Sequence, residues 1–225
     1  MKISILTLFP EMFEPLRCSI IKRATEKNVF ELNIVDIRPF SIDKHGKCDD
    51  EPFGGGAGMV MTPQPIYDAI NSLDPGHKAL RIYTSPKGAT LSVPTAKRLA
   101  TSQRDLIILC GHYEGVDQRV LDLCIDEEIS IGDYVLTGGE LPAMVIVDCV
   151  SRFIPGTIKE ESASGDSFSE GLLEYPQYTR PRVFMDLEVP EVLLSGHHEN
   201  IQKWRHEQSL AITKKLRPDL LEDKQ

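Results

Sequence analysis

The hydrophobic pattern alternates between two periods along the first two thirds of the chain. Five short apolar runs are typical of buried strands, and they span residues 2–9, 30–37, 79–85, 105–111 and 127–136. Segments with helical spacing of apolar residues lie between these runs, at residues 18–28, 63–73, 94–101 and 117–124. Strands that alternate with helices predict an α/β domain with a mainly parallel sheet and helices on both of its faces.

The segment after the last predicted strand has a different pattern. Residues 141–154 are apolar almost all round, which predicts a buried helix. Its few polar residues, Asp148, Ser151 and Arg152, follow the i, i+3, i+4 spacing that places side chains on one stripe of a helix. We therefore expect this helix to have one narrow polar edge and to be covered elsewhere.

Composition changes again after Gly156 and predicts a division of the chain. Residues 157–171 are small, polar and poor in helix formers, which is typical of a flexible linker. This linker separates a first domain, residues 1–156, from a second domain, residues 172–225. The second domain is predicted to be small and mostly helical, with its main helix over residues 199–216.

Length, composition and cysteine content predict a soluble cytoplasmic protein. Of the 225 residues, 41% are hydrophobic and 26% are charged, as in ordinary globular proteins. The first apolar run is followed at once by Pro10 and Glu11, so it reads as a strand and not as a signal peptide. No stretch approaches the roughly 20 apolar residues of a membrane span. The five scattered cysteines lack CxxC spacing, which indicates reduced thiols and argues against structural zinc.

The acidic charge is unevenly distributed. The net charge is −9, but residues 126–174 hold eleven acids against two bases and so account for all of it. Residues 200–217 carry five Lys or Arg against one Glu. An acidic total therefore leaves room for a polyanionic partner that contacts one face only.

A glycine-rich stretch, DDEPFGGGAGMVM at residues 49–61, raises the question of a phosphate-binding loop. It has no Gly-Lys-Ser/Thr, and Met59 occupies the position where a dinucleotide fingerprint starting at Gly54 requires its third glycine. A mobile or close-packing loop is the preferred interpretation, because glycine lets backbone approach closely. The neighbouring His197 and His198 resemble a metal pair but lack a third ligand at motif spacing, so no metal site is predicted.

Three segments that end predicted strands are better candidates for a ligand site. They are YTSPKG (83–88), LCGHYEG (109–115) and SIGDYVLTGGELP (130–142). Ligands gather at the carboxyl ends of parallel strands, so these loops can meet around one small molecule. Their polar side chains are few, which suits an adenine and ribose held by backbone groups better than a triphosphate. Ordinary strand-to-helix turns are the alternative.

Five longer stretches resemble one known family. They are LCGHYEGVDQRV (109–120), SIGDYVLTGGELPAM (130–144), SRFIPG (151–156), GDSFSEGLLEYPQYTRP (165–181) and VPEVLLSGHH (189–198). In this order they closely resemble the bacterial tRNA (guanine-N1)-methyltransferase (TrmD) family, and the likeness runs from the N-terminus to the WRHEQSL segment. The resemblance implies a SPOUT-type fold with a C-terminal trefoil knot, and a homodimer with its active sites at the subunit interface.

The same resemblance implies a reaction. S-adenosylmethionine would donate a methyl group to N1 of the guanine at tRNA position 37, 3′ of the anticodon, when another guanine precedes it. The partner is then the tRNA anticodon stem-loop, and Mg²⁺ is a further expectation from the family alone. Rival interpretations are another SPOUT RNA methyltransferase, acting on a ribose 2′-hydroxyl or on rRNA, and a non-catalytic RNA-binding module.

Residues for donor binding follow from the resemblance. They are Tyr83, Thr84, Ser85, Pro86, Gly111, Tyr113, Glu114, Ile131, Gly132, Asp133, Tyr134, Val135, Leu136, Gly138, Gly139 and Pro142. Glu114 and Asp133 are expected to accept hydrogen bonds from the donor, although surface solvation is the alternative for Asp133. The chain departs from the commonest family wording at Ala57, where Pro is usual, and at His112, where Arg is frequent.

Two residues are candidates for catalysis. Guanine N1 carries a proton at neutral pH, so its methylation needs a base and stabilisation of charge at O6. Asp166 matches the family's base, and Arg152 matches the residue that stabilises O6 or orients the guanine. From the residues alone, helix capping by the Asp166–Glu170 stretch and a salt bridge from Arg152 to Asp148 remain open.

Substrate contacts are expected in two places. Gly58 is placed by the resemblance beside the target guanine and the dimer partner. Basic residues of the second domain are expected to hold tRNA phosphates, and they are Lys203, Arg205, Lys214, Lys215 and Arg217. A solvated amphipathic helix explains the same charges equally well.

Overall fold

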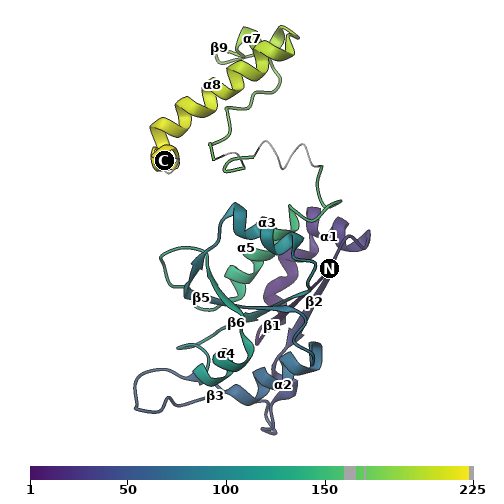
Figure 1. Cartoon of the computed structure of the whole chain (residues 1–225), viewed down its shortest axis with the longest axis vertical. Coiled ribbons are helices and arrows are strands. Elements are labelled where there is room, and N and C mark those ends of the chain that lie inside the picture. The colour runs from purple at the N-terminus through teal and green to yellow at the C-terminus, as the bar shows by residue number, and fades with distance from the viewer. Residues whose placement is uncertain (160–165, 170, 223–225) are drawn as a thin grey trace. The chain divides into compact units, whose positions relative to one another are not determined.

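The computed structural model describes residues 1–159, 166–169 and 171–222. Its chain divides into two compact units, Met1–Ile158 and Lys159–Gln225. The expected linker, residues 157–171, falls partly outside the described residues. Each unit is described by itself below (Figure 1).

A five-stranded parallel sheet forms the centre of the first unit. Its strands are β1 (Lys2–Thr7), β2 (Glu31–Asp36), β5 (Leu80–Thr90), β6 (Leu106–Cys110) and β7 (Glu127–Ser130). Their order is β2-β1-β6-β5-β7, and every neighbouring pair is parallel. The predicted α/β class with a mainly parallel sheet is therefore confirmed.

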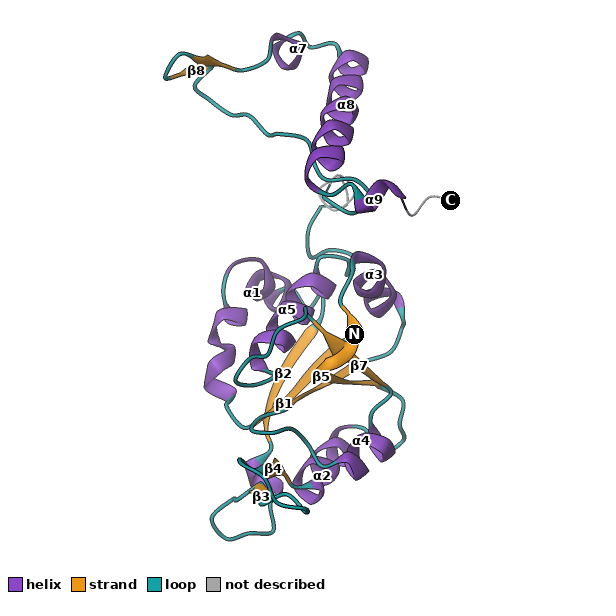
Figure 2. Cartoon of the chain, turned by 90° about the vertical axis from the view of Figure 1, so that its left-hand side faces the viewer, coloured by secondary structure: helices purple, strands orange, loops and turns teal. Residues whose placement is uncertain are grey.

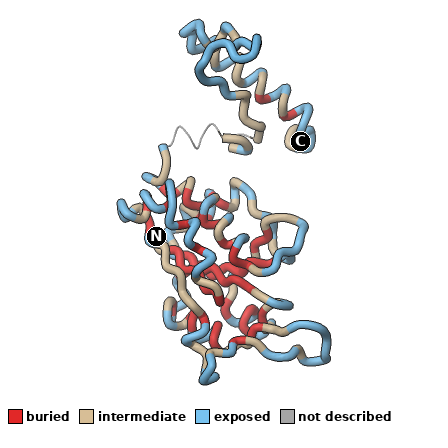
Figure 3. The backbone as a smooth tube through the Cα atoms, turned by 180° about the vertical axis from the view of Figure 1, so that it is seen from behind, coloured by how far each residue is buried: buried red, intermediate tan, exposed pale blue. Residues whose placement is uncertain are grey.

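Helices cover both faces of this sheet, as Figure 2 shows. One face carries η1 (Pro10–Arg17), α1 (Ser19–Glu26), α3 (Val93–Thr101) and α5 (Glu140–Ser151), and the other carries α2 (Pro63–Leu73) and α4 (Gln118–Cys124). Alternate residues of the central strands supply the two cores: Ile108 faces the α5 side, whereas Ile107 and Leu109 face α2 and α4. Both cores are buried, as the red tube over the sheet shows (Figure 3).

Two strands differ from their predicted limits by more than two residues at one end. β5 continues to Thr90, because the chain re-forms its pairing with β7 after a register shift between Thr84 and Ala89. β7 is shorter than the predicted run, and residues 131–136 form a loop. Ile131 still packs against the core, but the later apolar side chains of that loop, such as Val135 at 83% exposed, do not. The apolar run at residues 127–136 therefore includes both the strand β7 and the loop that follows it.

The glycine-rich stretch is framed by short elements. These are η2 (Arg38–Phe40), β3 (Asp49–Asp50) and β4 (Val60–Met61). β3 and β4 pair antiparallel, so residues 51–59 form the exposed connection of a hairpin. Positive φ angles at Gly54, Gly55, Gly56 and Gly58 explain why glycine occurs there.

The apolar helix is not covered all round. α5 buries Ala143, Ile146, Val147 and Val150, but Leu141 and Val145 are 47% and 44% exposed. The expected polar stripe also divides: Asp148 is exposed, whereas Ser151 is buried and donates a hydrogen bond to the Asp148 carbonyl at 2.9 Å. A small hydroxyl that bonds to its own helix needs no polar surface, so Ser151 is buried although its spacing places it on the same stripe as Asp148.

The second unit contains a short hairpin and helices. Its elements are β8 (Val183–Phe184), β9 (Leu187–Glu188), α7 (Glu191–Leu194), α8 (His198–Leu216) and α9 (Asp219–Glu222). α8 confirms the helix expected over residues 199–216. The backbone of Leu173 bonds to buried Thr213 of α8 at 2.8 Å, so the preceding segment lies along this helix. Across the described residues, no helix is both long and apolar enough to cross a membrane.

Candidate functional site

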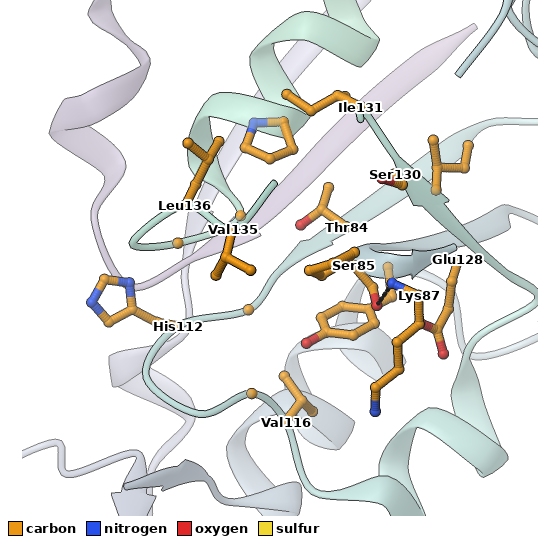
Figure 4. Close-up of a pocket in the computed structure, with 18 of the residues that line it drawn as sticks. Thr84, Ser85, Lys87, His112, Val116, Glu128, Ser130, Ile131, Val135 and Leu136 are labelled. Atoms are coloured by element: carbon orange, nitrogen blue, oxygen red, sulfur yellow. Dashed lines mark hydrogen bonds between the residues drawn. The ribbon is translucent and has the colours of Figure 1, made fainter. Parts of the chain in front are cut away.

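A pocket of about 350 Å³ lies at the carboxyl ends of β5, β6 and β7. Its walls are the three segments singled out in the sequence, at residues 83–88, 109–115 and 130–142 (Figure 4). Segments that are up to about fifty residues apart in sequence therefore converge here, because parallel strands end at the same edge of the sheet.

The first wall is the irregular part of β5. Thr84 is buried, and its Oγ1 donates a hydrogen bond to the Leu109 carbonyl at 3.2 Å, which ties this wall to β6. The chain then leaves the pairing with β7, and the Lys87 amide bonds to Ser85 Oγ at 3.1 Å. Gly88 is required where pairing resumes, since a Cβ there would lie 2.3 Å from the Glu128 backbone.

The second wall is a tight turn after β6. The Gly115 amide donates to the His112 carbonyl at 3.0 Å, and Tyr113 within the turn has a positive φ of 57°. Backbone bonds hold this turn from outside: Glu114 donates to the Met59 carbonyl and Met61 to the Gly115 carbonyl, at 3.0 and 2.9 Å. The glycine hairpin thus supports the pocket from behind.

The third wall packs against the other two with almost no space. The Gly139 amide donates to the Gly111 carbonyl at 2.7 Å. A Cβ on Gly139 would lie 2.1 Å from Thr84 Oγ1 and 2.9 Å from the Cys110 Cα. Ser130 orders the start of this wall, because its Oγ both donates to the Gly132 carbonyl and accepts from the Gly132 amide.

The pocket contains polar groups that the protein itself does not pair. Glu128 Oε2 and His112 Nδ1 are buried and have no hydrogen-bond partner among the described residues. Burial, with a smaller contribution from Glu128, raises the pKa of Tyr83 to about 12, so its phenol is neutral at physiological pH. Burial also raises the pKa of the Cys110 thiol. The site is therefore a mostly apolar recess with a few polar atoms free for a ligand.

The structure brings nearly all the predicted donor residues together. Every one of them except Asp133 lines the pocket, and Asp133 is exposed outside it. Further lining residues were not predicted, and they are Lys87, His112, Gly115, Val116, Gln118, Leu121, Glu128, Ile129, Ser130 and Thr137. Most of these are neighbours of predicted residues, so their strand-end position was a usable signal. Gln118 and Leu121 come from α4, and their approach depends on tertiary packing.

Gly58 is constrained by the second wall. A Cβ on Gly58 would lie 2.3 Å from Glu114 Oε1, and its φ of 85° also favours glycine. Residues 54–58 are exposed, and the stretch does not line the pocket. The interpretation of this loop as a close-packing loop therefore has a physical basis in the contact with Glu114.

The catalytic candidates lie in different units. Arg152 follows the last turn of α5 and is half-buried. Asp166 belongs to the second unit, where residues 166–169 form bends and turns. Ser167 Oγ accepts a hydrogen bond from the Glu174 amide at 3.0 Å, so this hydroxyl stabilises a turn. Glu170, the other half of the predicted capping box, lies outside the described residues.

The basic residues of α8 are not equivalent. Lys203, Lys214 and Lys215 are exposed. Arg205 is half-buried and lies over the Tyr175 ring at 4.8 Å, and Arg217 pairs with Asp219 at 2.7 Å. No group of three or more His, Cys, Asp or Glu within the described part of the chain is arranged to hold a metal.

Comparison with known proteins assigns the family. The model of the family described as tRNA (Guanine-1)-methyltransferase TrmD matches residues 1–223. This chain belongs to the TrmD family. Its relatives include proteins named tRNA (guanine-N(1)-)-methyltransferase from Alkaliphilus metalliredigens, 56% identical over 98% of this chain and 92% of the relative, and from Clostridioides difficile, 55% identical over 98% and 97%. The protein of the same name from Ruminiclostridium cellulolyticum is 58% identical, over 98% and 96%.

Proposed function

We propose that this protein transfers a methyl group from S-adenosylmethionine to N1 of the guanine at tRNA position 37, when guanine precedes it. Membership of the TrmD family supports the reaction class. The observation that carries the proposal for the site is the convergence of the three strand-end segments on one pocket. We place the enzyme in the cytoplasm, with tRNA as its partner.

The shape of the pocket fits an adenine nucleoside with a sulfonium tail. Glycines at 111, 132 and 139 line the recess, and a Cβ at any of them would clash with another residue of the walls, so the lack of side chains lets the walls close around a small ligand. The apolar side chains of Ile131, Leu136 and Pro142 suit an adenine ring. When bound, the donor supplies an electrophilic methyl group on a positively charged sulfur.

The remaining chemistry falls to Asp166 and Arg152. Asp166 accepts the proton of guanine N1, which turns a poor nucleophile into a competent one. Arg152 donates hydrogen bonds to O6, where negative charge develops as the proton leaves. The described residues include no cluster fit for Mg²⁺, so Mg²⁺ stays an expectation from the family alone.

A homodimer is part of the proposal. Pro142 in the first turn of α5 lines the pocket, whereas Arg152 follows the last turn. Ten residues of helix separate them by about 15 Å, so Arg152 lies at the opposite end of α5 from the donor pocket of its own chain, and we infer that it acts in the pocket of a second copy. The exposed Leu141 and Val145 of α5 and Met12 of the adjoining η1 offer an apolar surface for a second copy.

The knot and the role of the second unit complete the proposal. The third wall bonds to the second through Gly139 and an antiparallel bridge from Gly138 to His112, and such tight crossing of loops supports a trefoil knot. We infer that exposed Lys203, Lys214 and Lys215 contact tRNA phosphates, which predicts binding that weakens steeply with added salt.

One assay tests the activity. The full chain is incubated with methyl-labelled S-adenosylmethionine and tRNA transcripts that carry guanine or adenine before the target, and the modified atom is mapped. We expect N1-methylguanine only in the transcript with guanine. Ribose methylation would identify a different RNA methyltransferase, and donor binding without transfer would identify a non-catalytic module.

A pair of variants tests the proposed base. Asp166→Ala should reduce methyl transfer by about a thousandfold or more, because a base typically contributes 10²–10⁴-fold, while donor binding survives. Ser167→Ala is the matched control: it removes the hydrogen bond to the Glu174 amide and keeps the carboxylate, so most activity should remain. If both variants lose activity together with thermal stability, Asp166 is structural and the assignment fails.

A further inference from the structure

A buried carboxylate faces a histidine behind the pocket. Glu140 is the first residue of α5 and is 1% exposed. Its Oε1 accepts a hydrogen bond from Thr7 Oγ1 at 2.9 Å, while Oε2 lies 4.0 Å from Nδ1 of His112. The helix N-terminus favours a negative charge here. Even so, a buried carboxylate is costly unless a positive group offsets it.

His112 can supply that positive group. It belongs to the second wall and lines the pocket, at the edge shown in Figure 4. Its Nδ1 is the buried, unpartnered atom noted above. Its ring is held by Phe9 at 4.8 Å and Tyr113 at 4.7 Å between ring centres, so the imidazole has a defined position. His112 Nδ1, which has no hydrogen-bond partner, therefore lies near Glu140 Oε2, which has no Lys or Arg partner among the described residues.

Gly138 keeps the space between these two groups open. A Cβ at this position would lie 2.3 Å from Glu140 Oε2 and 2.7 Å from His112 Nδ1. Gly138 also pairs with His112 in an antiparallel bridge. His112 and Glu140 together thus connect the second and third walls of the pocket with Thr7 at the end of β1.

We propose that His112 is a positioning residue for the methyl donor, and that its ring pairs with the Glu140 carboxylate to hold the second and third walls together. This inference rests on the proposed function, because the donor occupies the pocket that those walls line. Loss of either partner therefore loosens the walls and lowers donor affinity.

Few other titratable groups surround His112. Tyr113 lies on its own turn, and Arg38 lies across the Phe9 ring, 5.2 Å from its centre. Cys110 is buried beside Glu140. Substitutions at His112 and Glu140 leave these groups in place, so the combined effect of the two substitutions reports on the pair.

Calorimetry with S-adenosylhomocysteine tests the inference. Affinity is measured for the full chain, for His112→Gln, Glu140→Gln and the double variant, for His112→Arg, and for a control, His77→Gln. His77 pairs with Asp126 at 2.8 Å and lies outside the pocket lining. We expect the control to bind like the native protein, and each Gln variant of the pair to lose about tenfold in affinity. The double variant should lose no more than either single variant, and His112→Arg, which keeps a donor beside Glu140, should retain most of the affinity.

The outcomes separate this inference from the proposed function. Native affinity in His112→Gln, or losses that simply add in the double variant, overturns the role of His112. Failure of the native protein to bind S-adenosylhomocysteine overturns the proposed function instead. Thermal melts establish that the variants are folded, and if the Arg variant is not, the comparison of His112→Gln with His77→Gln decides.

Discussion

The two ends of the parallel sheet handle polar groups in opposite ways. At the amino end, Asp74 accepts hydrogen bonds from the Lys78 and Ala79 amides and from the Arg81 guanidinium, so a buried ion pair is fully surrounded by partners. At the carboxyl end, Glu128 Oε2 and His112 Nδ1 have no hydrogen-bond partner among the described residues, and His112 only approaches Glu140, at 4.0 Å. The polar groups at the amino end are therefore fully hydrogen-bonded, whereas those at the carboxyl end are not.

Volume does not distinguish the two ends. The amino end has a hollow of about 580 Å³, larger than the pocket of about 350 Å³ at the carboxyl end. Among the described residues, those that line this hollow have no buried side-chain nitrogen or oxygen without a hydrogen-bond partner. Unsatisfied polar atoms and close glycine contacts therefore identify the functional end better than size does.

The largest effect on stability is expected at the amino end of the sheet, where the buried ion pair has all its partners within the protein. Asp74→Ala leaves the Arg81 guanidinium, 4% exposed, without its charged partner, and such a change costs about 3–5 kcal/mol of stability. The donor affinity of the folded protein should stay unchanged. Urea unfolding measures the first and calorimetry the second. Glu26→Ala, in an exposed pair with Lys22 at 3.8 Å, is the control and should cost below about 1 kcal/mol. If folded Asp74→Ala lost donor affinity, the two ends of the sheet would not be independent, and the contrast drawn between them would fail.

A pair of glycine variants tests the difference in packing. Gly139→Ala at the carboxyl end would place a methyl group 2.1 Å from Thr84 Oγ1, whereas Gly76→Ala at the amino end meets nothing closer than 3.6 Å. Neither glycine has a positive φ, so backbone strain does not intervene. We expect a loss of about a hundredfold in S-adenosylhomocysteine affinity, about 2.7 kcal/mol, for Gly139→Ala and no change for Gly76→Ala. Equal affinities would show that the contact between walls is unimportant.

A smaller effect concerns the phenol inside the pocket. The pKa of Tyr83 is raised to about 12, while an unfolded tyrosine titrates near 10. The folded state therefore holds this proton more tightly, and the resulting stability is complete below about pH 10 and lost as pH rises through about 12. Phe at this position cannot titrate. From about pH 10 to about pH 12, the free energy of unfolding of Tyr83→Phe should therefore fall by about 2 kcal/mol less than that of the native protein.

Unfolding in urea at stepped pH measures this difference. Tyr67→Phe is the matched control, because Tyr67 is 45% exposed on α2 and should leave the native pH profile unchanged. If Tyr83→Phe and the native protein lose stability in parallel, burial of the phenol at the pocket is not what opposes its ionisation.

Periodicity was sufficient for the order of elements but not for the way strands end. α2 spans Pro63–Leu73, the range expected from its apolar spacing. In contrast, the stretch at residues 83–88 looked like a turn, and only pairing with β7 beyond it shows that β5 continues. Residues 131–136 looked like strand, because an apolar run gives no sign of whether a ligand or the core covers it.

The site was predicted at the level of loops and not of contacts. Strand-end position located nearly all the lining residues, with Asp133 the exception. The pairing of His112 with Glu140 joins residues that are 28 positions apart, and no local pattern connects them. Gly138 and Gly139 looked like turn residues, whereas the structure shows that they exclude a side chain between packed walls. Such requirements arise from tertiary approach alone.

The interruption in β5 has a consequence for redesign. Thr84 and Ala89 both lie opposite Ile129, so the sheet is anchored on each side of the four residues between them. A segment bracketed in this way can change length without shifting the register of the strands, provided that Gly88, which packs against the Glu128 backbone, is kept. Residues 85–87 are therefore the insertion point for an engineer who wants the pocket to admit a bulkier sulfonium analogue and to keep the register of the sheet.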